Sequence, residues 1–152
     1  MQSAWISALV VILTVLLADA VWLTAMSSFY KASVRKVQHS DMRVRLAGAV
    51  VAYAAVAWLL LDVALPNVRR ALASGASLLW ASFRYAGLLG LGAYAIYNAT
   101  SYAIYEGYDG LVAVADTLWG TFLFSLVAIL AITVERAAAF SSELEFKMLL
   151  NR

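Results

Sequence analysis

Three carboxyl or carboxamide side chains stand inside long apolar runs of the sequence: Asp19, Asn98 and Asp116. An ionised Asp at the centre of a bilayer costs roughly 2.5 to 3.5 kcal/mol on an insertion scale, so such groups face protein or water rather than lipid. Counted from the ends of their runs at 1.5 Å per residue, the three lie at one level, within roughly 10 Å of one membrane surface. We call this set the polar layer. Such a layer could carry protons or cations, or could hold helices together.

Further polar and aromatic side chains are placed to hydrogen-bond into the polar layer. Those near Asn98 on the same run are Tyr94, Tyr97, Thr100 and Ser101. Trp22 and Trp119 each follow an Asp by one helical turn on the same face. Both segments read Asp-x-x-Trp-x-Thr, and their helices are expected to run in opposite directions, as in an inverted repeat. Six positions also allow coincidence.

A second pair of charges, Asp62 and Arg84, lies toward the opposite membrane surface. Helical side chains tilt toward the helix N-terminus, so Arg84 can reach toward that surface and meet Asp62. The pattern favours a structural ion pair, and the alternative is an ion or substrate site.

Four apolar runs of spanning length must position these residues. Their approximate bounds are 5–26, 44–65, 78–105 and 111–134. Pro66 is expected to end the second helix, and the breaker-rich turn at residues 106–110 predicts an antiparallel hairpin of helices three and four. The predicted fold is all-α, a four-helix transmembrane bundle over residues 1–134 with antiparallel neighbours. The side on which the first helix begins is called X, and the other side, which holds the loop at residues 27–43, is called Y.

The two ends of the chain carry separate expectations. Ala18-Asp19-Ala20 matches a signal-peptidase site in form, but no Lys or Arg precedes the apolar run, so a first spanning helix is expected. Residues 135–152 are expected to form an amphipathic tail. Its segment 142–145 reads as a capping box, which predicts a short helix lying at the X interface.

Small residues predict where helices approach closely. A 3.6-residue stripe joins Arg84, Tyr94, Asn98 and Ser101 on helix three, which is therefore expected to be the central helix. Ala86 and Gly90 on helix three, and Gly48 and Ala52 on helix two, are spaced as small-xxx-small surfaces for close helix packing.

Composition excludes several classes of function. Hydrophobic residues make up 64% and charged residues 13% of 152 residues, far from a soluble domain, so a multi-pass membrane protein in contact with the lipid bilayer is expected. Cys is absent and the one His, His39, lies in a basic loop, so no metal and no cofactor is expected. Basic residues are spread over loops, which argues against nucleic acid. They are also equally numerous on sides X and Y, so the positive-inside rule leaves the orientation open.

Three spaced motifs carry a resemblance to a known family. The segments are Asp19-Ala-Val-Trp22-Leu23 followed by Phe29-Tyr30, Tyr94 to Ser101, and Asp116-Thr-Leu-Trp119-Gly120-Thr121. They resemble an uncharacterised family of small membrane proteins, catalogued as domain of unknown function 2177, over roughly residues 5–132. The resemblance implies a four-helix membrane protein with no established activity. In the family pattern Asp usually stands at the position of Asn98 and Asn at that of Ser101, and this departure favours a structural role here.

Two functions follow as hypotheses. Short loops, small-residue faces and the lack of a catalytic constellation favour a non-enzymatic subunit that packs with other membrane protein subunits in a larger assembly. The alternative is a small proton- or cation-linked transporter or channel that uses Asp19, Asn98 and Asp116.

Overall fold

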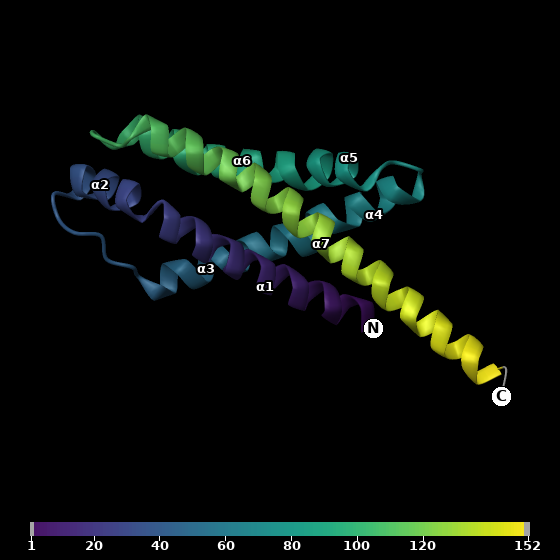
Figure 1. The fold of residues 1–152 in the computed structure, drawn as a ribbon. Coiled ribbons are helices and arrows are strands. Elements are labelled where there is room, and N and C mark those ends of the chain that lie inside the picture. The colour runs from purple at the N-terminus through teal and green to yellow at the C-terminus, as the bar shows by residue number, and fades with distance from the viewer. Residues whose placement is uncertain (1, 151–152) are drawn as a thin grey trace.

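The fold is all-helical: the computed structural model describes residues 2–150 and contains no strand among them. The first helix, α1 (Gln2–Ala25), and the last, α7 (Gly110–Leu150), run antiparallel and pack on each other (Figure 1). The observed bounds of α1 agree with the predicted run 5–26. Within residues 2–150, three helical stretches are long and apolar enough to cross a membrane: Trp5–Ala25, Leu46–Ala73 and Gly110–Leu150.

The second apolar run continues past its proline. α3 (Leu46–Trp58) leads into a π-helical segment, η1 (Leu59–Ala64), and then into α4 (Leu65–Ala73). The expectation that Pro66 ends this helix is therefore wrong. Pro66 lies in the first turn of α4, where a residue without an N–H group is tolerated, and the wider turn of η1 directly precedes it.

The third apolar run forms a helix over residues 78–104, close to the predicted 78–105. It consists of α5 (Leu78–Ser82), a second π-helical segment, η2 (Phe83–Gly87), and α6 (Leu88–Ile104). Its longest α-helical piece has 17 residues. Within residues 2–150, the helices long and apolar enough to span a membrane are the three named above, and this helix is not among them. The four-helix transmembrane bundle remains a prediction.

The expected boundary between helix four and an amphipathic tail is not observed. α7 runs for 41 residues, and the segment 142–145 lies within it, so the expected capping box does not begin a new helix. The helix continues because residues 135–150 contain neither Gly nor Pro and are rich in Ala, Leu and Glu. The last turns of α7 extend beyond the other helices (Figure 1). Residues 151 and 152 of the predicted tail lie outside the described residues.

The Y-side connection, expected as a loop, contains a helix. α2 (Ser27–Gln38) follows α1 after one residue and ends at His39, which adopts a left-handed conformation with φ of 54°. Its polar composition suggested a loop, but Ser33 is buried and α2 packs on the start of α7, so burial on one face stabilises this short helix.

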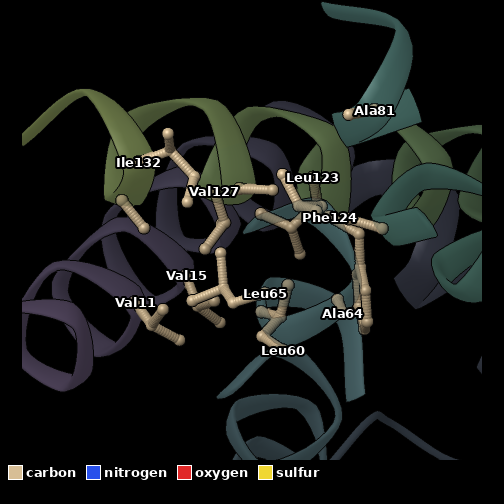
Figure 2. Packing of buried hydrophobic residues seen from close by; sticks show 14 residues of the cluster. Val11, Val15, Leu60, Ala64, Leu65, Ala81, Leu123, Phe124, Val127 and Ile132 are labelled. Atoms are coloured by element: carbon tan, nitrogen blue, oxygen red, sulfur yellow. The ribbon is translucent and has the colours of Figure 1, made fainter. Parts of the chain in front are cut away.

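α7 forms the centre of the structure and contacts α1, α2, α4, α5, α6 and both π-helical segments. Helix three was expected to hold that place, and this expectation is wrong. The core gathers side chains from α1, from η1 with α4, and from α7, including Val11, Leu60 and Phe124 (Figure 2). The outer surface carries large exposed apolar side chains on every long helix, such as Leu17, Val51 and Leu118, as expected for helices in lipid.

Candidate functional site

Asp116, itself half-buried, is the centre of a hydrogen-bond network on side Y. One of its carboxylate oxygens accepts from the Tyr30 hydroxyl at 2.5 Å, and the other accepts from Asn98 Nδ2 at 2.9 Å. Asn98 is 1% exposed, and its Oδ1 accepts from the Tyr108 hydroxyl at 2.8 Å. α2 and α6 thus meet α7 at one carboxylate, and the turn before α7 joins the network through Asn98.

Asp19 is held by the tryptophan of the opposite motif. Its carboxylate accepts from Trp119 Nε1 at 2.7 Å, and the residue is 8% exposed. The indole rings of Trp22 and Trp119 stack with centroids 4.7 Å apart and planes within 2° of parallel. Trp22 Nε1 donates to Tyr30 at 2.9 Å, and Tyr30 donates to Asp116. Trp119 of α7 therefore bonds directly to Asp19 of α1, and Trp22 of α1 is connected to Asp116 of α7 through Tyr30.

The two Asp-x-x-Trp-x-Thr segments thus make corresponding contacts, because the Trp of each segment is connected to the Asp of the other. The two threonines also behave alike, because the Thr24 hydroxyl donates to the carbonyl of Ala20 at 2.6 Å and the Thr121 hydroxyl donates to that of Thr117 at 3.2 Å. α1 and α7 run in opposite directions (Figure 1). The geometry is the one expected of an inverted repeat. We call Asp19, Trp22, Tyr30, Asn98, Tyr108, Asp116 and Trp119 the Trp–Asp network.

The structure places the other residues expected near this layer in different surroundings. Tyr97 and Thr100 are exposed on α6, away from the buried face that carries Asn98. Ser101 is buried one turn from Asn98. The ring of Tyr94 packs edge-on against Phe124, and its backbone carbonyl accepts from Asn98 Nδ2 at 3.0 Å.

Two tyrosines, Tyr30 and Tyr108, complete the network, and the sequence did not predict either of them as part of the polar layer. Burial, followed by the hydrogen bond to Asp116, raises the pKa of Tyr30 above its usual value. Burial, together with the nearby Tyr97 and Asp116, raises the pKa of Tyr108 to about 12. Both hydroxyls therefore stay protonated and act as donors at neutral pH. Tyr30 follows Trp22 by eight residues, but the helix break at Met26 hides that relation in the sequence.

The predicted ion pair of Asp62 and Arg84 does not form. Both residues are exposed, and among residues 2–150 neither takes part in a salt bridge. The guanidinium of Arg84 lies 5.7 Å from the centroid of the Tyr85 ring. Asp62 lies in η1 and Arg84 in η2. A π turn closes i to i+5 bonds and so takes up one extra residue, which turns a side chain by about 100° from its position in a regular α-helix.

The arginine that pairs with a carboxylate between helices on side X is instead Arg69 of α4, and its partner is Glu135 of α7. Arg69 donates to both carboxylate oxygens, with distances of 2.6 and 3.1 Å. Ser7 of α1 donates to Glu135 at 2.5 Å and accepts from Arg69 at 3.2 Å. The two-point contact joins three helices that are distant in sequence.

Of the residues expected to allow close packing, only Ala86 and Gly90 lie inside the protein. Ala86 is fully buried, and a Cβ built on Gly90 would lie 2.3 Å from the backbone carbonyl oxygen of Gly120. Gly48 and Ala52 are exposed on α3, and a Cβ on Gly48 would meet nothing within 4 Å. The close contact inside the protein is therefore between α6 and α7.

Asp109 fixes the start of α7. Its Oδ1 accepts from the backbone N–H groups of Leu111 at 3.0 Å and Val112 at 3.4 Å, and Lys36 of α2 pairs with Oδ2 at 3.3 Å. These contacts, the Leu111 N–H first, hold the pKa of Asp109 below its usual value.

Replacing Asp109 with Ala is expected to lower the thermal stability at neutral pH, because α7 loses its cap and Lys36 its partner. A carboxyl group whose pKa is lowered by folding contributes stability above its unfolded pKa and loses it as the pH falls through the folded pKa. The difference in Tm between wild type and D109A should therefore shrink as the pH falls through 3.8 and below. Glu106 in the same turn is exposed and caps no helix, so E106A is the matched control. A difference that is independent of pH would contradict this account.

The fold and the Trp–Asp network define a class: an apolar, all-helical protein in which two intramembrane carboxylates, one buried and one half-buried, accept hydrogen bonds from tryptophan and tyrosine. The family model described as "Predicted membrane protein (DUF2177)" matches residues 4–133, and the chain belongs to this family of membrane proteins. The resemblance inferred from the three motifs is thereby confirmed. No curated protein and no solved structure matches the chain.

Proposed function

We propose that this protein is a non-enzymatic subunit of a larger membrane assembly, and that α3 is the helix that meets another polypeptide. One observation carries the proposal: none of the 13 residues of α3 is buried. Only Tyr53, Val56 and Ala57 are partly buried against the core, so α3 adds little to the stability of its own chain. Gly48 and Ala52 nevertheless give it a flat surface, which suits close approach to a second helix in lipid, where association depends on packing and polar contacts.

The contact between α3 and α1 supports the same proposal. A groove of about 220 Å³ lies between the two helices and is lined by apolar side chains, among them Ile12, Leu16 and Ala57. α3 is thus held mainly at its C-terminal end, where η1 and α4 enter the core. A partner helix can pack on α3 without displacing any buried residue.

The hydrogen bonding of the Trp–Asp network also supports a structural function. Both oxygens of Asp116 accept from protein donors, and Asp19 accepts from Trp119. A site that passes cations needs carboxylate oxygens open to water or to the ion. Here these oxygens hold four parts of the chain together.

Replacing Gly48 and Ala52 with Leu is expected to reduce recovery of the partner at least tenfold when the tagged protein is purified in mild detergent at natural abundance. The thermal stability of the protein itself should change little, because a side chain on Gly48 meets nothing in this chain. The matched control is the pair Gly92→Leu and Ala103→Leu, two exposed small residues on α6. The control variant should retain the partner.

A protein that migrates as a free monomer in every mild detergent would overturn the proposal. The transport hypothesis would then be tested in reconstituted vesicles. Proton or cation flux that is lost in both Asp19→Asn and Asp116→Asn would establish it in place of the subunit proposal.

A further inference from the structure

A hollow on side Y lies where α2 turns toward α3. It has a volume of about 750 Å³, and its lining includes Arg35, His39, Arg43 and Arg45. The chain around it is fixed by hydrogen bonds. Gln38 Nε2 donates to the carbonyls of Ser40 at 3.3 Å and Asp41 at 2.9 Å. The hollow is therefore part of an ordered turn.

The charge in this hollow is mainly positive. Three arginines line it against one acidic residue, Asp41, which pairs with Arg35. Among the residues that the structure describes, neither Arg43 nor Arg45 has a salt-bridge partner. Two arginines that line one hollow without a salt-bridge partner favour an anion with several oxygen atoms, and the fork of N–H donors matches phosphate best.

The position of the hollow relates it to the membrane surface. Arg45 directly precedes Leu46, where a stretch long and apolar enough to span the membrane begins. Val44 and Leu46 are 77% and 75% exposed, so apolar side chains alternate with the two arginines. A second hollow, of about 440 Å³, shares Arg35 and adds Lys31 and Lys36. The basic surface therefore continues along α2 at the level of the lipid headgroups.

We propose that the hollow between α2 and α3 binds the phosphate group of an anionic ligand through Arg43 and Arg45, and that this ligand is the headgroup of an anionic phospholipid. A phosphate ion alone would fill a small part of 750 Å³, which leaves room for the glycerol and ester groups attached to the phosphate of a phospholipid. The apolar residues Val44 and Leu46 then lie against the acyl chains. A soluble phosphorylated compound offers the same chemistry.

The test uses the full-length protein in a mild detergent, titrated with phosphatidylglycerol or with phosphatidylcholine of the same acyl chains. Native mass spectrometry counts the bound lipids. The wild type should bind phosphatidylglycerol more tightly than phosphatidylcholine. The variant R43Q/R45Q should lose about thirtyfold in affinity for phosphatidylglycerol alone. R70Q/R136Q, which removes two exposed arginines outside the hollow, is the control of equal charge and should bind like the wild type.

Three results would overturn the site: equal binding of the two lipids, an unchanged R43Q/R45Q variant, or the same loss in R70Q/R136Q. Inorganic phosphate distinguishes the source of the ligand. If millimolar phosphate displaces phosphatidylglycerol, the site takes free phosphorylated compounds; if it does not, the lipid headgroup is the ligand. The measurement is made on the isolated chain, so its outcome does not depend on whether α3 binds a partner.

Discussion

Gly90→Ala is expected to destabilise the protein by about 3 kcal/mol, because α6 and α7 touch through their backbones at this point. The new Cβ would lie 2.3 Å from the Gly120 carbonyl oxygen, and 2.8 and 2.9 Å from two atoms of the Phe124 side chain. A backbone carbonyl cannot rotate away as the end of a flexible side chain can, so the two helices must separate. Phe124 is fully buried, and the separation would open the core around it.

Gly92→Ala is the matched control on the same helix. A Cβ there meets nothing within 4 Å, and an Ala in a helix interior is favoured over Gly by about 0.5 to 1 kcal/mol. The two variants should therefore change stability in opposite directions in a reversible unfolding titration in mixed micelles. Equal effects of both substitutions would show that α6 and α7 are not in backbone contact.

Asp116→Ala is expected to cost about 2 kcal/mol. The substitution leaves the Tyr30 hydroxyl and the Asn98 amide without their shared acceptor in a buried site. Hydrogen bonds between helices in membranes contribute about 0.6 kcal/mol on average and at most about 1.7, which sets this scale for two bonds. Tyr30 would also be less well placed to orient Trp22, so the near-ultraviolet circular dichroism of the stacked indoles should weaken.

Asp62→Ala provides the comparison for Asp116→Ala, because Asp62 is an exposed carboxylate that has no salt bridge among the described residues. It should leave both the stability and the dichroism nearly unchanged. If Asp116→Ala also left the stability and the dichroism unchanged, the Trp–Asp network would not be what holds the Y ends of the helices together.

Local patterns in the sequence predicted the bounds of those helices whose ends are set by the segment itself. The run 78–105 and the breaker-rich turn at 106–110 agree with the structure to within about a residue, because length, apolarity and Gly placement are properties of the segment itself. Counting residues along each run predicted a shared level for Asp19, Asn98 and Asp116, and in the structure Asn98 contacts Asp116 while Asp19 contacts Trp119, one turn from Asp116. The hydrogen-bond donor that each of these side chains contacts could not be predicted by counting residues, because it depends on how the helices pack.

The wrong expectations depend on features that lie outside a regular 3.6-residue period. The two π turns change which residues face inward, and they leave both Asp62 and Arg84 on the outer surface. The pairing of Arg69 with Glu135 joins residues 66 positions apart, and no local pattern marks either of them. Pro66 illustrates the same point, since its effect on a helix depends on the turn before it.

Residues 135–150 of α7 continue straight from a helix whose preceding part is fixed by the core. At 1.5 Å per residue these residues add roughly 24 Å to a helix of about 62 Å in all, which exceeds the full thickness of a bilayer with its headgroups. The end of such a long helix therefore moves when the bundle tilts. A tilt of the bundle by about 20°, the mean for membrane helices, would carry the tip sideways by roughly 8 Å relative to the membrane boundary. A long helix tilts more in a thinner bilayer. The distance from the membrane surface to a spectroscopic label at the end of α7 would therefore change with the thickness of the bilayer.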